Sequence, residues 1–103
     1  MTRKTNYTNG SQQRILKVLL TMFGHEIDGL APGQLAKLAG IKPDEATRDL
    51  NNLLQAGFAE LVPHNNHYRI TPMLGQKSLA ILSTIERAAQ RVEETRSRYT
   101  RNV

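Results

Sequence analysis

The sequence predicts a mainly α-helical protein that carries one small β-hairpin and ends in a long helix. Apolar residues recur at helical spacing in four segments, and the period changes to alternation in twos between Ala59 and Ile70. With 103 residues, of which 39% are hydrophobic, the chain can bury one modest core. It has no Cys, so disulfides, thiolate metal sites and cysteine nucleophiles are excluded.

A first helix is expected after the polar, basic residues 1–10, which we interpret as a mobile arm. Ser11 suits the N-cap of this helix, and Gly24 ends it before a turn at Ile27-Asp28-Gly29. Its apolar stripe is wider than one small core needs. The stripe consists of Ile15, Leu16, Val18, Leu19, Leu20, Met22 and Phe23.

Two shorter helices are expected next, one from Pro32 to about Ala39 and one over about residues 44–56, after a very short strand at Leu30. Gly40 stops the first of them. The predicted inner residues are Leu35, Leu38 and Ala39 in the former and Ala46, Leu50, Leu53 and Leu54 in the latter. The outer face of the latter presents Thr47, Arg48, Asn51, Asn52 and Gln55.

Residues 58–71 are predicted to form a hairpin, because apolar residues there alternate in twos on both sides of Asn65-Asn66. If these two asparagines occupy the turn, Leu61 lies opposite Ile70, and the hairpin has one apolar face.

The final helix is expected to run from Pro72 or Met73 to near Tyr99. Part of it repeats the alternating four- and three-residue spacing of a coiled-coil seam. The seam residues are Ile81, Ile85, Ala88, Val92, Thr95 and Tyr99. Because the part beyond about Ala89 would project past so small a core, we interpret the seam as the interface of a homodimer. The alternative is an amphipathic helix that lies on its own domain.

The order of these elements, which is helix, short strand, helix, turn, helix and hairpin, is that of a winged helix-turn-helix domain. Residues 15–70 resemble the N-terminal DNA-binding domain of IclR-type transcriptional regulators. Five blocks carry the resemblance: Arg14-Ile15-Leu16-Lys17-Val18-Leu19, Leu35-Ala36-Lys37-Leu38-Ala39-Gly40-Ile41, Ala46-Thr47-Arg48-Asp49-Leu50-Asn51-Asn52-Leu53, Gly57-Phe58-Ala59-Glu60 and Tyr68-Arg69-Ile70. Related classes such as MarR-type regulators share much of this pattern and stay open as an alternative.

The resemblance implies that the third helix enters the major groove of double-stranded DNA, while the hairpin lies as a wing along the flanking backbone or minor groove. Arg48 stands where the family has an arginine in its recognition helix, and a guanidinium there can bind a phosphate or a guanine. The alternative for Arg48 is an ion pair with Asp44, four residues earlier. The further candidates are Thr47, Asn51 and Asn52 for bases, Lys37 and Lys42 for phosphates, His64, Asn65, Asn66, His67 and Arg69 on the wing, and Arg3 and Lys4 in the arm.

The sequence departs from the family's pattern in three ways. Residues 41–72 hold three Lys or Arg against four Asp or Glu. Two of the acids, Asp44 and Glu45, would repel phosphate at the start of the recognition helix unless one caps the helix or accepts from cytosine. Ala31-Pro32 replaces the usual Ser or Thr cap before the second helix. Only about thirty residues follow the wing, so we expect neither the family's effector domain nor a small-molecule ligand.

The remaining sequence features restrict the class of function. A net charge of +5 favours polyanionic partners such as nucleic acid. The sequence shows no secretory signal and no apolar run of bilayer length, so a cytoplasmic protein without a membrane partner is expected. It has no glycine-rich phosphate loop and no catalytic triad, and His64 and His67 lack the further ligands of a metal site. We therefore expect no enzyme, no cofactor and no metal.

Together these features predict a basic arm over residues 1–10, a winged helix-turn-helix domain over 11–71 and a dimerisation helix over 72–103. The predicted function is that of a homodimeric, sequence-specific DNA-binding transcriptional regulator of bacterial or phage origin. The alternative is a protein-interaction module on the same scaffold, such as a phage protein that acts on host machinery or in a replication complex.

Overall fold

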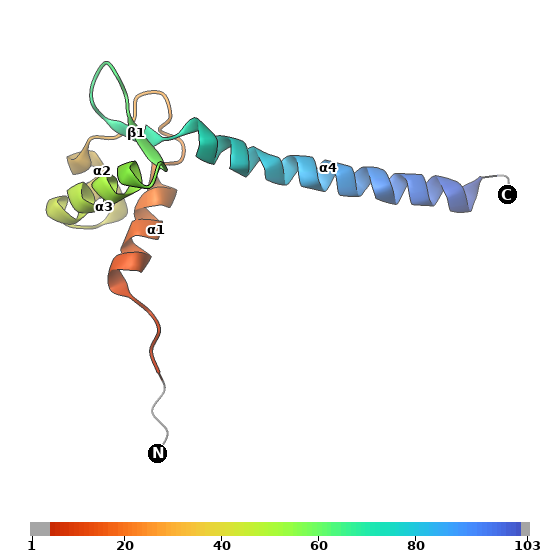
Figure 1. Cartoon of the computed structure of the whole chain (residues 1–103), viewed down its shortest axis with the longest axis horizontal. Helices are drawn as coiled ribbons and strands as arrows, with labels where there is room; N and C mark the ends of the chain where they lie inside the picture. The colour runs from red at the N-terminus through yellow and green to blue at the C-terminus, as the bar shows by residue number, and fades with distance from the viewer. Residues whose placement is uncertain (1–4, 102–103) are drawn as a thin grey trace. The chain divides into compact units, whose positions relative to one another are not determined.

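A computed structural model describes residues 5–101, and Figure 1 shows the elements in chain order. They are α1 (Gly10–Met22), α2 (Pro32–Ala39), α3 (Pro43–Gln55), β1 (Ala59–Leu61), β2 (Tyr68–Ile70) and α4 (Pro72–Thr100). The predicted fold class, mainly helical with one two-stranded hairpin and a long C-terminal helix, is confirmed. Contacts divide the chain into two compact units, one up to Thr71 and one from Pro72 onward.

The N-cap of helix α1 lies two residues before the predicted one. The side chain of Asn9, not that of Ser11, accepts a hydrogen bond from the backbone N–H of Gln12 at 3.0 Å, and Ser11 lies inside the first turn. The helix ends at Met22, and Phe23 has an extended backbone, so Phe23 does not belong to the helical stripe as predicted. Only Val18 and Met22 of α1 are buried, because α2 and α3 pack against one side of the predicted stripe.

Helix α2 has the predicted ends, Pro32 at its first position and Gly40 at its C-cap with a left-handed φ of 68°. The side chain of Gln34 accepts a hydrogen bond from the N–H of Ala31 at 3.0 Å and so replaces part of the missing Ser or Thr cap. The prediction that Leu38 faces inward is wrong, because it is 59% exposed. The buried residues of α2 are Leu35, Ala36 and Ala39.

Helix α3 begins at Pro43 and buries the predicted Ala46, Leu50 and Leu53. Leu54 is only half-buried, and the inner face includes an unexpected charged residue, Asp49. The apolar residues lie against α1, α2 and β1, with which α3 makes its contacts.

The hairpin forms as predicted, but its register is shifted by two residues. Ala59 lies opposite Ile70, and Leu61 opposite Tyr68. The turn is longer than a two-residue loop, because the N–H of Val62 donates to the carbonyl oxygen of His67 at 2.8 Å and closes four residues between them. Within this turn Asn66 takes a left-handed φ of 57°, which asparagine tolerates better than most residues.

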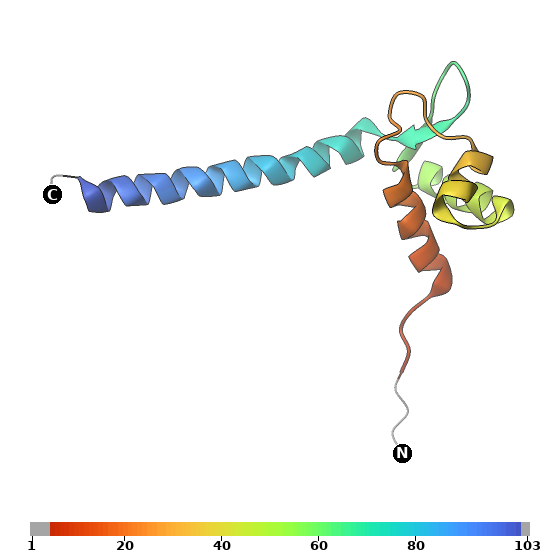
Figure 2. The same ribbon diagram turned by 180° about the vertical axis from the view of Figure 1, so that it is seen from behind.

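Leu30 forms the predicted very short strand as an antiparallel bridge to Tyr68, with N–O distances of 2.8 and 2.9 Å. Figure 2 shows the loop after α1 beside the turn of the hairpin. Gly29 makes this approach possible. Its φ is 68°, and a Cβ at this position would lie 2.8 Å from the carbonyl oxygen of Tyr68 and 2.9 Å from Cγ2 of Val62.

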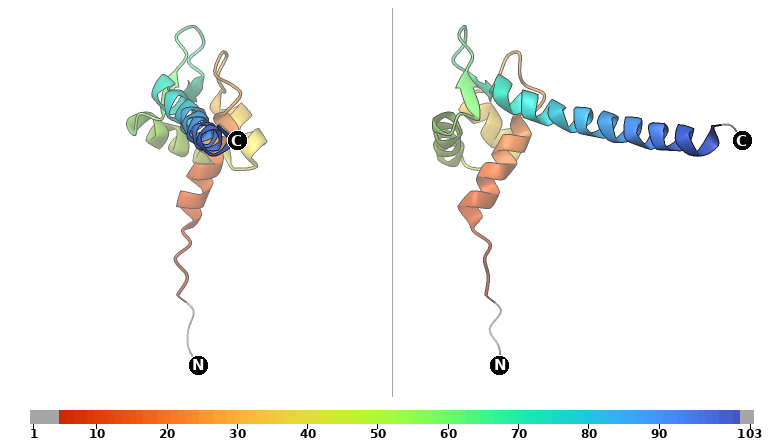
Figure 3. Two further views of the ribbon diagram at one scale, coloured as in Figure 1. Left: turned by 90° about the vertical axis from the view of Figure 1, so that its right-hand side faces the viewer. Right: turned by 45° about the vertical axis from the view of Figure 1, so that its right-hand side comes forward.

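The second unit consists of α4, which begins at Pro72 as predicted and runs unbroken through 29 residues (Figure 3, right). None of its described side chains is buried. Among residues 5–101 no helix combines the length and the apolar character needed to cross a membrane.

Candidate nucleic-acid interface

The outward face of α3 is polar and open to solvent. The side chains of Thr47, Arg48, Asn51 and Asn52 are all exposed on it, as the sequence predicts. Two of them hydrogen-bond to their own helix, since Thr47 Oγ1 donates to the carbonyl oxygen of Pro43 at 3.1 Å and Asn52 Nδ2 donates to that of Arg48 at 2.9 Å. These bonds fix the two side chains near the helix surface and leave the Asn52 side-chain oxygen free to accept.

Arg48 is the cation on this face of α3. Its side chain is 64% exposed, and its Nη2 lies 3.8 Å from Oδ2 of Asp44, which is 70% exposed. An exposed pair of this kind at one helical turn contributes at most about 1 kcal/mol. The ion pair that the sequence offered as the alternative role for Arg48 therefore exists, and it is weak enough to yield to a phosphate or a base.

The other two acids of α3 are turned away from this face and bound by Arg14 of α1. Arg14 Nε and Nη2 donate to the two carboxylate oxygens of Asp49 at 2.7 and 2.8 Å. Arg14 Nη1 donates to Glu45 at 3.0 Å, and the other carboxylate oxygen of Glu45 accepts from the N–H of Lys42 at 3.0 Å. Glu45 thus caps α3 while Arg14 compensates its charge.

These contacts change the pKa of the Arg14 guanidinium. The hydrogen bonds to Asp49 raise the pKa of Arg14 above its ordinary value, and the charges of Asp49 and Glu45 add to this although desolvation opposes it. The contacts with Asp49 and Glu45 therefore favour the charged form of Arg14.

Arg14 was not among the predicted site residues, although the sequence contains a signal for it. Arg14 precedes the buried Val18 and Met22 by one and two helical turns, so it lies on the inner stripe of α1. Asp49 shares the inner stripe of α3 with Ala46 and Leu50. Opposite charges on two apolar stripes indicate a pair, because an isolated buried charge is costly.

On the wing, three of the five predicted DNA-contacting side chains form hydrogen bonds or an ion pair within the domain. Arg69 Nε donates to Glu60 at 2.8 Å across the hairpin, so Arg69 is bound to the fourth acid of residues 41–72. Asn65 Nδ2 donates to the carbonyl oxygen of Asp28 at 3.0 Å, and Nδ1 of His67 lies 3.1 Å from the same oxygen. Asn66 and His64 are exposed. The wing is therefore anchored to the loop after α1.

The lysines predicted to contact phosphate are both exposed. Lys37 lies in the last turn of α2 and Lys42 at the N-cap of α3, and neither forms an ion pair within residues 5–101. Lys17 of α1 joins them near the turn between the two helices, since its Nζ lies 4.0 Å from where a Cβ on Gly40 would be. The predicted contacts Arg3 and Lys4 lie outside the described residues.

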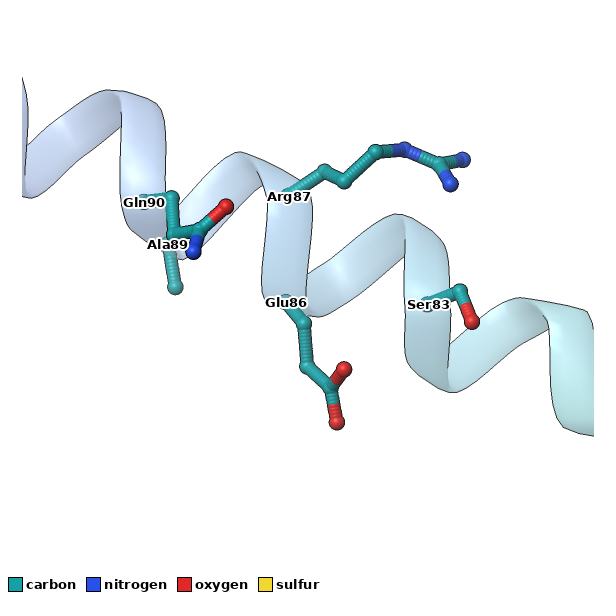
Figure 4. A pocket seen from close by; sticks show the side chains of 5 residues that line it. All are labelled: Ser83, Glu86, Arg87, Ala89 and Gln90. Atoms are coloured by element: carbon teal, nitrogen blue, oxygen red, sulfur yellow. The ribbon is translucent and has the colours of Figure 1, made fainter.

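The predicted dimer seam lies along α4, with Ile81, Ile85, Val92 and Tyr99 all exposed. A shallow surface hollow on this helix is lined by Ser83, Glu86, Arg87, Ala89 and Gln90. Figure 4 shows that these side chains all come from one helix and that Glu86 and Arg87 point in different directions. The hollow brings no polar groups together around a common point, as a small-molecule site would.

Comparison with known proteins gives a structural relative. No protein-family model matches the chain, and no curated protein sequence matches it. A solved structure of a MarR family transcriptional regulator from Silicibacter pomeroyi DSS is similar, with a TM-score of 0.52 and 22% identity over 87% of this chain. The chain spans only 57% of the length of that protein. At this identity the likeness concerns the fold: it confirms the winged helix-turn-helix architecture and lends no support to the IclR type over other winged helices.

Proposed function

We propose that the protein is a sequence-specific, double-stranded-DNA-binding transcriptional regulator whose α3 enters the major groove. The observation that carries this proposal is the division of charge and hydrogen-bonding groups around α3. Arg48, Asn51 and Asn52 face outward, whereas Glu45 and Asp49 are held by Arg14 on the other side. Arginine and asparagine are the side chains that read guanine and adenine through paired hydrogen bonds.

The arrangement removes the main objection that the acidic residues of this segment raised. A helix with three uncompensated carboxylates would be repelled by the phosphates of the groove. Here only the Asp44 carboxylate stands on the exposed face, and it lies within reach of Arg48. Lys17, Lys37 and Lys42 supply positive charge beside the helix start, where phosphate contacts set the position of a recognition helix.

The seam on α4 supports a homodimer, and a dimer would read two half-sites of an approximately two-fold symmetric operator. A cytoplasmic regulator of bacterial or phage origin is the form of this function that the sequence features favour. Such a protein would act by blocking or by recruiting the transcription machinery.

Selection from a random-sequence duplex pool, read by sequencing at two salt concentrations, tests this function. We expect enrichment of a two-fold symmetric motif, and an affinity that falls with salt but keeps its sequence preference. Sequence-blind binding that disappears at the higher salt would contradict the proposal. Sedimentation of the free protein in the same buffers reports the oligomeric state separately.

A protein-interaction module is the second candidate, and one specific observation favours it. The outer side of α1 and the loop that follows it expose Leu16, Leu20 and Ile27, the last two at 71% and 80%. Leu16 and Leu20 lie one helical turn apart on α1, and contiguous exposed apolar side chains mark contact surfaces more often than isolated ones do. Under this hypothesis Leu20→Ser would abolish capture of the partner, whereas Arg48→Ala would leave capture of the partner unchanged.

A further inference from the structure

We propose that α4 pairs with α4 of a second copy in the antiparallel direction, with the seam centred on the middle of the helix. This inference rests on the homodimer of the proposed function and adds its geometry. Residues that project onto one side of α4 form eight successive layers of a coiled-coil seam, and none of them is charged. They are Leu74, Ser78, Ile81, Ile85, Ala88, Val92, Thr95 and Tyr99.

The order of side chains along this seam is nearly the same from either end. In an antiparallel pair centred between Glu86 and Arg87, each layer joins a residue to its counterpart on the other side of the centre. The resulting layers are Leu74 with Tyr99, Ser78 with Thr95, Ile81 with Val92, and Ile85 with Ala88. The centre coincides with the middle of the 29-residue helix, so the whole length of each α4 faces its partner.

The two hydroxyl residues of the seam fall in one layer and are compatible with it. Ser78 Oγ donates to the carbonyl oxygen of Leu74 at 3.0 Å, and Thr95 Oγ1 donates to that of Arg91 at 2.8 Å. Each hydroxyl is therefore hydrogen-bonded within its own helix, and the carbon atoms of these side chains face the second helix. No polar group in this layer is left without a hydrogen bond when the seam is covered.

Side chains next to the seam discriminate between the two directions. Leu82 is 56% exposed and lies on the same flank of the seam as Ala89. In an antiparallel pair this flank faces the same flank of the partner, so Leu82 packs on Ala89 and extends the apolar contact. In a parallel pair the opposite flanks meet, and Leu82 would face Lys77 instead.

Charge does not decide the direction. A parallel pair would bring Arg91 near Arg96 of the facing helix, and an antiparallel pair brings Lys77 near Arg98. Both contacts lie at the exposed edge, where such pairs contribute little. The apolar pattern therefore selects between the two.

The estimated size of the contact lies at the lower limit of specific dimer interfaces. A helix of 29 residues is about 43 Å long. Covering a third to a half of the side of two such cylinders removes roughly 900 to 1,350 Å² of surface, which reaches the lower range of specific interfaces. In this arrangement the two ends that bear Pro72 lie about 43 Å apart.

Disulfide trapping tests the direction, because the chain has no Cys of its own. Ser78→Cys and Thr95→Cys are made separately, one with an added tag so that the three dimers differ in size on a non-reducing gel. We expect neither variant to cross-link with itself, since equal positions then lie about 25 Å apart along the axis. A refolded equimolar mixture should give the mixed disulfide in about half of the chains, the share that random pairing produces.

Ser83→Cys, on the opposite side of the helix, is the control and should cross-link in no combination. The pair Ile81→Cys and Val92→Cys repeats the test at a second layer, should either first variant fail to fold. Self-cross-links of Ser78→Cys and Thr95→Cys would overturn the antiparallel direction, as would a sedimenting dimer without any mixed disulfide. A monomer would overturn the dimer itself. The wild-type chain's DNA selection is a separate readout, so loss of the direction and loss of the regulator are distinguishable.

Discussion

Arg14 on α1 and Asp49 on α3 form a two-pronged ion pair, with Nε–Oδ2 and Nη2–Oδ1 distances of 2.7 and 2.8 Å. The pair joins residues 35 positions apart and fixes the side of α3 that faces the core. Because Arg14 also binds Glu45, one cation holds two of the three acids of α3 away from its outward face. The same contacts therefore stabilise the fold and keep two carboxylates off the candidate DNA surface.

Breaking this pair should lower both stability and DNA affinity. Asp49→Ala is expected to cost about 1–3 kcal/mol of the free energy of unfolding, because the charged hydrogen bonds of Arg14 lose their partner. Arg14→Ala should also destabilise the fold, and should weaken DNA binding by leaving Glu45 uncompensated. Urea unfolding and DNA titration measure the two effects, with Arg87→Ala on α4 as the matched control for loss of one positive charge.

The contribution of Arg14 should not change between about pH 6 and 10. Its pKa is raised in the folded protein, so the stabilisation is fully present below the ordinary pKa of arginine and is lost only as the pH rises through the raised pKa of the folded state. The difference in unfolding free energy between wild type and Arg14→Ala is the measurement. A difference that disappears near neutral pH would show that another group controls the pair.

Arg48→Ala should weaken binding to the selected operator by about 1–3 kcal/mol, the discrimination carried by one bidentate contact to a base. If Arg48 binds only a phosphate, the loss should be equal for all sequences and the salt slope should fall by about one. Titrations with operator and scrambled duplexes at several salt concentrations separate these outcomes. Unchanged affinity for both duplexes would exclude Arg48 from the interface.

Asp44→Asn is expected to strengthen DNA binding by about 0.5–1 kcal/mol, because it removes the exposed carboxylate that competes for Arg48 and repels phosphate. Glu86→Gln on α4 is the control, since it makes the same change of charge outside the candidate interface. Weaker binding by Asp44→Asn would instead identify Asp44 as an acceptor from cytosine.

Gly29→Ala should destabilise the first unit by about 2–3 kcal/mol, because its backbone is left-handed and a Cβ would press on the hairpin. Gly33→Ala, in the first turn of α2 with open space around it, should be neutral or stabilising by about 0.5 kcal/mol. The denaturant midpoint should thus fall for Gly29→Ala and stay constant or rise for Gly33→Ala. Equal midpoints would mean that the loop after α1 relaxes away from the wing.

Ile85→Asp should convert the dimer to a monomer in sedimentation, because it places a carboxylate near the centre of the seam on each helix. Ser83→Asp on the polar side of α4 should leave the dimer intact. A dimer that persists in Ile85→Asp would place the interface elsewhere, with the exposed side of α1 as the next surface to test.

The sequence by itself determined most of the helix boundaries, because the signals that start and stop a helix are local. Pro32, Gly40 and Pro72 mark ends that the structure confirms. The alternation in twos and the single residue Leu30 likewise predicted the small sheet. The outward face of α3 followed from helical periodicity alone, since its inner residues Leu50 and Leu53 set the orientation.

Only the tertiary structure decided which apolar and charged residues are covered. Ala36 and Leu38 flank the stripe of Leu35 and Ala39 on opposite sides, and the packing of α2 on α1 and α3 buries Ala36 and leaves Leu38 exposed. The hairpin register depended on a turn closed between Val62 and His67, which two asparagines in sequence do not reveal. These outcomes depend on the distance between elements, which local patterns do not contain.

The acids of α3 show the same limit at the candidate site. A count over residues 41–72 makes this segment look unsuited to DNA, because the compensating charge of Arg14 lies outside it. The fold brings Arg14 to Asp49 and Glu45 from 35 and 31 residues away. Ion pairs depend on distances in space, so the net charge of the outward face of α3 is known only once the packing of the helices is known.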